Sequence, residues 1–441
     1  MRAVIDGSIR PKIALRDLIG RLVLLFNDRI AIRAIRALPE SEAEVRQREE
    51  PRSHMMSSKT DTRSGVFGAL AALVLGFALP ASAQVPNIVQ VAAGNQHTCA
   101  LDDTGRVWCW GDNSMGQLGN GTSTDGLTPV LVRRVTDAVA IASGSDHSCA
   151  VLSTGRVACW GNNDYGQLGD GTTGFANPDR VLVRRVGDAV AVAASASHTC
   201  ALRESGRVYC WGDNAYGQLG DGTADTRLTR VSVRRISDAT AIIAGFYHTC
   251  ALRGSSRIAC WGSNRQGQLG IGSSQLQSSP SRLAVRRLRD ATAIGSGAYH
   301  NCAVRSSGGM ACWGYGGDGQ IGDGYRGNRW TPATVTGITD ARLVSAGFRH
   351  SCAIREGGDL ACWGDNDFGQ LGNGTNTPSA TWVAVAGVTD ASALSAGRYH
   401  TCAALRATGR VVCWGQNWRG QLGDNSNEHR STPVEVVFPQ P

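Results

Sequence analysis

The sequence predicts an all-β fold, a seven-bladed β-propeller of four-stranded antiparallel blades. A segment that runs from His-x-Cys through Cys-Trp-Gly recurs seven times, and its histidines follow one another at steps of 50 to 52 residues. Each copy holds four short strand signals, and the chain shows little helical periodicity. A repeat of this length with four strands is typical of a propeller blade. The seven histidines are His97, His147, His198, His248, His300, His350 and His400.

The first copy shows how one unit is built. Its four strand signals lie at Val89–Ala93, His97–Leu101, Arg106–Trp110 and Pro129–Val132. The second and third are joined by Asp102–Gly105, a polar turn that ends in glycine and therefore favours a hairpin. The fourth follows a long polar loop.

Both ends of the repeat region also match parts of a unit. Residues 87–91 resemble residues 137–141, which open the second copy, and residues 433–437 resemble residues 129–133. The two ends therefore occupy consecutive places in the circle, and we expect them to lie adjacent. The pattern leaves open whether they share one blade or face each other across two.

The repeats account for residues 84–441, and residues 55–83 resemble a secretory signal peptide. Lys59 and Arg63 precede an apolar run at 66–79, and Ala81-Ser82-Ala83 supplies a small-residue cleavage site. The run is too short for a comfortable membrane span. We therefore expect a secreted or periplasmic protein with no membrane span after cleavage.

Residues 1–54 precede this signal, where an exported chain normally begins. We interpret them as a mis-assigned start, with Met55 or Met56 as the true first residue. The alternative is a membrane-surface helix over residues 13–38, where arginines alternate with Leu, Ile and Val.

The charge balance argues against a nucleic-acid binder. Beyond residue 83 the chain keeps 31 arginines, no lysine and 27 acidic residues, which gives a net charge of +4. Such binders usually show a concentrated basic stripe and a more extreme balance. We expect no specific nucleic-acid partner.

The cysteines predict one disulfide in each copy. If Leu101 pairs with Val107 across the predicted hairpin, Cys99 lies directly opposite Cys109, within the range of a disulfide. Closing such an eleven-residue ring stabilises a hairpin by about 2 to 3 kcal/mol on the chain-entropy model. The last pair is one residue further apart, and we expect a bulge at Ala403-Ala404 to absorb that residue. The expected pairs are Cys99 with Cys109, Cys149 with Cys159, Cys200 with Cys210, Cys250 with Cys260, Cys302 with Cys312, Cys352 with Cys362, and Cys402 with Cys413.

A metal site is the competing interpretation of the same residues. His97, Cys99 and Cys109 offer three soft ligands, but the close C-x₂₋₄-C spacing and the fourth ligand of a zinc site are missing. We expect neither a metal nor another cofactor.

The remaining invariant residues have structural explanations. The tryptophans of Cys-Trp-Gly are expected to pack between neighbouring sheets, and the histidines to form a repeated side-chain-to-backbone hydrogen bond. The tryptophans are Trp110, Trp160, Trp211, Trp261, Trp313, Trp363 and Trp414.

Three spaced elements of each unit resemble the regulator of chromosome condensation repeat. In the first copy they are Gly94 with His97, Trp110-Gly111, and Gly116-Gln117-Leu118-Gly119. They recur in all seven copies, with Ser195 in place of the first glycine in the third and Ile321 in place of leucine in the fifth. The resemblance implies a seven-bladed propeller.

The family includes a nuclear exchange factor for a small GTPase, a plant UV-B photoreceptor and secreted bacterial inhibitors of β-lactamase. The exchange factor has an inserted wedge, for which the regular spacing here leaves no room. The photoreceptor has tryptophans between the glycine and histidine of its repeats, where this chain has none. The resemblance is therefore closest to the secreted bacterial type.

The two residues between that glycine and histidine are the candidate binding site. A propeller places all seven pairs on one ring, and the pairs of the last four copies form an aromatic and cationic sector. The candidate residues are Phe246, Tyr247, Tyr299, Phe348, Arg349, Arg398 and Tyr399.

We therefore predict an exported, monomeric, non-enzymatic propeller that binds a protein or a cell-surface ligand through one rim. A carbohydrate-binding propeller is the first alternative, because exposed aromatic rings stack on sugars. Guanine-nucleotide exchange, by family analogy, is the second. No G-x-S-x-G, H-E-x-x-H or nucleotide-loop motif indicates an enzyme.

Arginine doublets occur in the first four copies. We interpret them either as a cationic arc that faces an anionic cell surface or as ordinary solvated turn residues. The doublets are Arg133-Arg134, Arg184-Arg185, Arg234-Arg235 and Arg286-Arg287.

Overall fold

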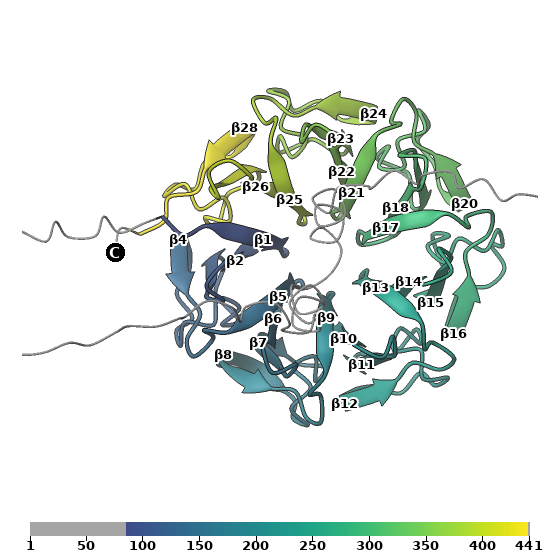
Figure 1. Ribbon diagram of the computed structural model, residues 1–441, viewed down its shortest axis with the longest axis horizontal. Coiled ribbons are helices and arrows are strands. Elements are labelled where there is room, and N and C mark those ends of the chain that lie inside the picture. Colours follow the sequence, from purple (N-terminus) through teal and green to yellow (C-terminus); the bar gives the residue numbers. More distant parts are fainter. Residues whose placement is uncertain (1–84, 440–441) are drawn as a thin grey trace, which may run out of the picture. The chain divides into compact units, whose positions relative to one another are not determined.

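The computed structural model describes residues 85–439, and these form seven four-stranded antiparallel sheets arranged as the blades of a propeller (Figure 1). Each blade consists of four consecutive strands in simple sequential order. The predicted all-β fold and the number of blades are thereby confirmed. The predicted upstream segment and signal peptide lie outside the described residues. Within residues 85–439 the structure contains no helix that is long and apolar enough to cross a membrane.

The strands are short, and their bounds follow the repeat. Blade 1 contains β1 (Ile88–Ala93), β2 (His97–Asp102), β3 (Val107–Gly111) and β4 (Gly126–Leu131). Blade 2 contains β5 (Ala138–Ser143), β6 (His147–Leu152), β7 (Val157–Asn163) and β8 (Gly174–Leu182). Blade 3 contains β9 (Ala189–Ala194), β10 (His198–Arg203), β11 (Val208–Gly212) and β12 (Arg227–Ser232). Blade 4 contains β13 (Ala239–Ala244), β14 (His248–Arg253), β15 (Ile258–Ser263) and β16 (Ser278–Ala284).

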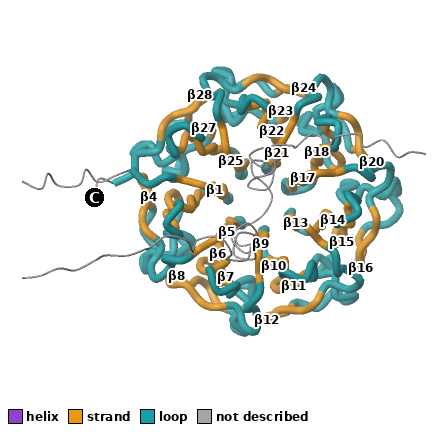
Figure 2. The backbone as a smooth tube through the Cα atoms, viewed as in Figure 1, coloured by secondary structure: helices purple, strands orange, loops and turns teal. Residues whose placement is uncertain are grey.

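The last three blades repeat this plan. Blade 5 contains β17 (Ala291–Ser296), β18 (His300–Arg305), β19 (Met310–Gly314) and β20 (Arg329–Thr334). Blade 6 contains β21 (Ala341–Ala346), β22 (His350–Arg355), β23 (Leu360–Gly364) and β24 (Ser379–Ala384). Blade 7 contains β25 (Ala391–Ala396), β26 (His400–Leu405), β27 (Val411–Gly415) and β28 (Arg430–Glu435). In Figure 2 the first strand of each blade lies nearest the centre and the fourth lies at the perimeter.

Each central hairpin has the register that the sequence predicts. In blade 1, Leu101 pairs with Val107 and Cys99 pairs with Cys109. All fourteen cysteines are joined in this way, as seven disulfides that each close one hairpin, and these are the pairs expected from the sequence. The other six bonds join Cys149 with Cys159, Cys200 with Cys210, Cys250 with Cys260, Cys302 with Cys312, Cys352 with Cys362, and Cys402 with Cys413.

The expected bulge in the last hairpin is wrong. Strands β26 and β27 pair without a register shift from His400 opposite Gly415 to Ala404 opposite Val411. The extra residue lies in the turn instead, where the Gly409 amide donates to the Leu405 carbonyl four residues back. The corresponding turn of blade 1 closes over three residues. A surface turn can lengthen at little cost, whereas a bulge would disturb the ladder beside the disulfide.

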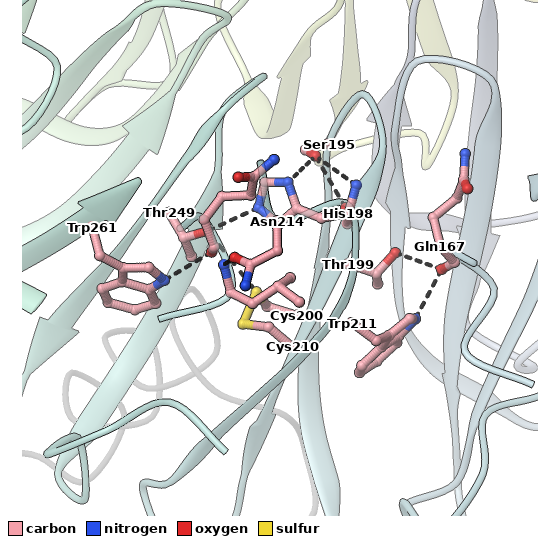
Figure 3. The surroundings of a disulfide bond; sticks show 12 residues. Gln167, Ser195, His198, Thr199, Cys200, Cys210, Trp211, Asn214, Thr249 and Trp261 are labelled. Atoms are coloured by element: carbon pink, nitrogen blue, oxygen red, sulfur yellow. Dashed lines mark hydrogen bonds between the residues drawn. A yellow bond between two sulfur atoms is a disulfide. The ribbon is translucent and has the colours of Figure 1, made fainter. Parts of the chain in front are cut away.

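The tryptophans of Cys-Trp-Gly join neighbouring blades, as expected. Trp211 of blade 3 is fully buried, and its Nε1–H donates to the Gln167 carbonyl of blade 2 at 2.8 Å (Figure 3). All seven tryptophans make this bond to the preceding blade at 2.8 to 3.0 Å, including Trp110, which donates to Gln421 across the seam. The indole also packs against Gly-Gln-Leu-Gly of that blade, where a Cβ on Gly169 would lie 2.7 Å from the ring of Trp211.

The seven histidines also connect blades, but not through the backbone bond that we expected from the sequence. His147 Nε2 lies 2.8 Å from Thr199 Oγ1 of the next blade, and the Thr199 hydroxyl donates to the Gln167 carbonyl at 2.9 Å. The same contact recurs in every blade, with serine, threonine or asparagine as the partner. Sequence reasoning missed it because the partner is about 50 residues away.

This arrangement fixes the tautomer of the buried histidines. The single hydroxyl proton of Thr199 goes to the Gln167 carbonyl, so the hydroxyl oxygen must accept the proton of His147 Nε2. Nδ1 is then the unprotonated nitrogen. It is buried without a hydrogen-bond partner in six of the seven histidines, whereas His198 Nδ1 accepts from the Ser195 hydroxyl at 2.7 Å.

The ring closes between two complete blades, which answers the question that the sequence left open. Blade 1 and blade 7 each keep four strands of their own. Across the seam, Thr98 bonds to His400 at 2.8 Å, and the Ile88 amide donates to the Gly409 carbonyl. Phe438, just after β28, contacts Trp108 edge-on at 5.8 Å between ring centroids. The expected proximity of the two ends of the repeat region is confirmed.

Replacing Phe438 with alanine is expected to destabilise the fold by about 3 kcal/mol or more, because Phe→Ala in a core typically costs 3 to 5 kcal/mol. Phe438 is 7% exposed and packs in one cluster with Trp108, Trp110 and Val436, so its truncation removes buried contacts at the seam. Urea unfolding would measure the loss. Val437→Ala is the matched control, since Val437 is 49% exposed. Equal effects of the two substitutions would contradict a closing role for Phe438.

Candidate binding face

The Gly-x-x-His pairs all lie at the same end of their blades. In blade 1 the chain leaves β1 at Ala93, passes through Asn95-Gln96 and enters β2 at His97. The other blades repeat this path, so the seven pairs surround the central axis at the inner ends of the blades (Figure 1). We call this end of the propeller the pair face.

The first residue of the motif must be small because blades approach closely there. A Cβ on Gly94 would lie 2.3 Å from His97 Cε1 and 2.5 Å from the Gly144 carbonyl oxygen of the next blade. Close packing of these turns positions the pairs rigidly, and the variable side chains project from a fixed ring.

Aromatic side chains of blades 4 and 6 meet on the pair face. The ring centroids of Phe246 and Phe348 are 5.2 Å apart, although a whole blade separates them in sequence. Blade 5 has the small Ala298 at the equivalent position, which is 3% exposed and leaves room for both rings. Tyr299 contacts Phe246 at 5.7 Å and Phe348 at 5.9 Å.

The predicted sector is longer than the sequence indicated. At one end Tyr216 lies 5.1 Å from Tyr247, and at the other Phe368 lies 5.3 Å from Tyr399. Phe368 in turn contacts Trp418, which is 57% exposed. We call this continuous set the aromatic row, and its members are Tyr216, Tyr247, Phe246, Tyr299, Phe348, Tyr399, Phe368 and Trp418.

Sequence reasoning missed Tyr216, Phe368 and Trp418, which belong to a second variable position. They stand one or two residues before Gly-Gln in the loop after Cys-Trp-Gly, where the seven copies also differ from one another. Comparing the copies at that position would have found them. Tyr216 and Phe368 contact the pair of the following blade, and Trp418 contacts Phe368 of the preceding blade. Only the tertiary structure shows these contacts.

Both predicted arginines lie against the row. Arg398 has its Cζ 5.0 Å from the centroid of Phe348 and 5.1 Å from that of Tyr399, and its Nη1 donates to Asn95 Oδ1 at 3.1 Å. Arg349 pairs with Asp318 at 3.6 Å and lies 5.5 Å from the centroid of Phe348. All seven predicted residues are therefore brought together in one patch.

The rest of the pair face is polar. Asn95, Ser145 and Asp146 occupy the pairs of blades 1 and 2. Burial is the main cause that raises the pKa of the Asp146 carboxyl, and a hydrogen bond from Asn95 and the charge of Arg398 act in the opposite direction. The face thus has an aromatic side and a polar side, with Arg398 between them.

The centre of the face holds a cavity of about 90 Å³, lined mainly by glycine, alanine and serine of all seven blades, with Phe246, Phe348 and Arg398 at its edge. Sites for organic ligands usually measure about 300 to 1,000 Å³. Such a cavity suits a few water molecules and is too small for a typical organic ligand. Among residues 85–439 no group of three or more His, Cys, Asp or Glu side chains is placed to hold a metal ion.

Comparison with protein families gives one extensive match. The family model of the RCC1-like domain matches residues 76–351, more than half of the chain. Models of the regulator of chromosome condensation (RCC1) repeat match residues 341–370, 391–421 and 358–404.

Among curated proteins the chain resembles two human ligases. It is 30% identical over 254 residues to the probable E3 ubiquitin-protein ligase HERC4 of Homo sapiens, which covers 57% of this chain and 19% of that protein. It is 30% identical over 141 residues to the E3 ubiquitin-protein ligase HERC2 of Homo sapiens, which covers 31% of this chain and 3% of that protein. The chain thus spans only a small part of these relatives.

Solved structures share the fold. Human WBSCR16 superposes with a TM-score of 0.69 at 19% identity, over 76% of this chain and 94% of that chain. Yeast RCC1 (Prp20), in its structure bound to Kap60, gives a TM-score of 0.66 at 21% identity, over 81% of this chain and 85% of that chain. At these identities the likeness concerns the fold alone.

Proposed function

The chain belongs to the family of the RCC1-like domain, and on this basis we propose that it is an exported, non-enzymatic propeller that binds a protein partner through its pair face. The aromatic row carries the proposal. It joins residues of blades 3 to 7 into one surface on a rigid scaffold. Aromatic and arginine side chains are enriched at the energetic centres of protein interfaces.

The chemistry of the row suits a protein surface. Successive rings of the row contact one another at 5.1 to 6.2 Å between centroids, and most of them are only partly exposed. Ordered side chains of this kind lose little conformational entropy on binding. Arg398 and Arg349 add charged groups that are already held in place and that a partner's carboxylates can meet with two parallel hydrogen bonds.

The export part of the proposal is supported by the seven disulfides, since such bonds persist in oxidising compartments. Guanine-nucleotide exchange is less well supported. The spacing of 50 to 52 residues leaves no insertion between blades, and the loops of the described chain stay close to one length.

Single alanine substitutions of Tyr247, Phe348 and Tyr399 are expected to weaken partner binding by about 1 to 2 kcal/mol or more each, as for interface hot spots. Pull-down from the native cell envelope identifies the partner, and calorimetric titration then measures its affinity for each variant. Tyr325→Ala is the matched control, because Tyr325 is 68% exposed and lies outside the aromatic row.

The proposal is contradicted if these substitutions lower the melting temperature but leave partner binding intact. The row would then be structural, and the loop with Tyr325, Arg326 and Trp330 would be the next candidate surface. A carbohydrate-binding propeller is distinguished by competition, because free sugar would then displace the partner. If the partner is a protein, free sugar should leave its binding unchanged.

A further inference from the structure

The arginine doublets lie at the end of the blades opposite the pair face. Strand β4 starts at Gly126, which pairs with Gly111 beside the pair face, and ends at Leu131, which pairs with Trp108 farther down the blade. Arg133 and Arg134 follow directly. Equivalent turns follow β8, β12 and β16, and we call these four segments the arginine turns, at residues 132–135, 183–186, 233–236 and 285–288.

The second arginine of every doublet has a backbone conformation that favours glycine. Arg134, Arg185, Arg235 and Arg287 have φ between 57° and 59°. Blades 5 and 6 place Gly337 and Gly387 at the same position, with φ of 78° and 70°. A left-handed residue with a long side chain is less stable there than glycine. Four blades nevertheless carry arginine.

No contact within the propeller accounts for these side chains. Among residues 85–439, the guanidinium groups of the four left-handed arginines have no hydrogen bond or ion pair, and all four residues are exposed. The same holds for Arg184, Arg234, Arg286 and Arg289, whereas Arg133 has an ion pair with Asp179 at 3.4 Å.

The nearby aspartates are already paired with other arginines. Asp188, Asp238 and Asp290 follow three of the turns, and they bind Arg203, Arg253 and Arg305 at 2.6, 2.8 and 3.1 Å. Apart from Arg133, whose partner is Asp179, the arginines of the turns therefore have no ion pair with a carboxylate among the described residues.

The charge is confined to one side of the ring. From the start of the outer strand to the aspartate after the turn, blades 1 to 4 contain 13 arginines and 5 aspartates. The corresponding segments of blades 5 to 7 contain 2 arginines and 3 acidic residues. Random surface variation among seven copies of one unit would not separate the two groups so sharply.

We propose that the arginine turns dock the protein on a membrane surface that carries anionic lipid headgroups. Blades repeat by rotation about the central axis, so equivalent turns lie on one circle, and one plane contacts all four of them. The four left-handed arginines are exposed, and no residue of the arginine turns lines the cavity of the pair face, so a flat surface fits these turns. The pair face then points away from the membrane.

The guanidinium group suits this partner. It is always charged and presents a planar fork to a phosphate. Each basic residue near an anionic bilayer contributes about 1 kcal/mol, which falls off within a Debye length. Several arginines on one plane therefore give reversible, salt-dependent adsorption without an inserted segment.

Replacing all four left-handed arginines with glycine (R134G/R185G/R235G/R287G) tests the proposal. Vesicles of phosphatidylcholine with about one third phosphatidylglycerol are the probe, and flotation measures binding. We expect the variant to bind on the order of 1,000-fold more weakly than the wild type, by the additive contribution of four charges. Its melting temperature should be unchanged or higher, because glycine relieves the left-handed strain.

A charge-matched control removes four arginines of the last three blades (R326Q/R342Q/R406Q/R410Q). This control should keep vesicle binding. It shows whether binding depends on where the arginines lie or only on the net charge of the protein. The proposal is overturned if the control loses as much binding as the glycine variant, if wild-type protein binds pure phosphatidylcholine equally well, or if it binds heparin or DNA but no vesicles. Partner binding through the pair face is measured separately in solution, so either proposal can fail alone.

Discussion

Lowering the pH from about 6.5 to about 4.5 is expected to unfold the propeller, because seven buried histidines accept protons only when the chain opens. Each of them is 0% exposed and donates its Nε2 proton to a neighbouring blade. Six have no partner for Nδ1, where an added proton would reside. The charged form is therefore excluded from the folded state.

Burial is the main cause that lowers these pKa values. The pKa is about 3 for His97, His147, His198, His300, His350 and His400, and about 4 for His248. In the unfolded chain a histidine has a pKa of about 6.5. Between these limits the unfolded state binds more protons than the folded state, so stability is complete above about pH 6.5 and falls as the pH decreases.

The expected size is large because the effect is repeated. One such histidine changes the free energy of unfolding by up to about 1.4 kcal/mol per pH unit, and seven together approach 5 to 10 kcal/mol per pH unit. Two carboxyls act the other way. Burial raises the pKa of Asp146 and Asp365, so the folded state binds their protons more readily and gains stability on acidification. Seven histidines outweigh two carboxyls.

Urea unfolding at a series of pH values measures the effect as a slope. His350→Gln should reduce that slope by about one proton, whatever it does to the stability at neutral pH. His429→Gln is the control: His429 is exposed on the surface, and although burial lowers its pKa too, its replacement should reduce the slope less than His350→Gln does. A midpoint that is constant over this range, or buried histidines that titrate near 6.5 in the folded protein, would contradict the prediction.

Loss of the seven disulfides is expected to have an effect of similar size. Each ring of about eleven residues contributes about 3 kcal/mol by restricting the unfolded chain, so seven independent rings approach 20 kcal/mol. A typical domain is stable by about 5 to 15 kcal/mol in total. Protein refolded with reductant should therefore melt far lower than oxidised protein, or fail to fold.

Folded protein should nevertheless resist reductant. All fourteen cysteines are at most 1% exposed, so a thiol reaches them only after a blade opens. Non-reducing peptide mapping of the folded protein should find Cys99 with Cys109, Cys402 with Cys413, and the five equivalent pairs. The double variant C402A/C413A should lose about 3 kcal/mol. Fourteen alkylatable thiols in folded protein, or links between different blades, would refute the prediction.

The sequence by itself determined what lies within one repeat. Four strands, the register of the hairpin and the pairing of Cys99 with Cys109 all involve residues about ten positions apart, where alternation and turn residues act directly. Seven copies also show which positions vary. The seven candidate residues followed from that comparison, and the structure places them in one patch.

Only the tertiary structure decided what lies between repeats. The partner of each histidine is about 50 residues away, and the last one, Thr98 with His400, is 302 residues away. No local pattern specifies such a contact. The contact of Phe246 with Phe348 depends on the small Ala298 between them. The left-handed backbone conformation of Arg134 depends on how β4 leads into β5. These features arise from the packing of whole blades, because side chains from different units must share one volume.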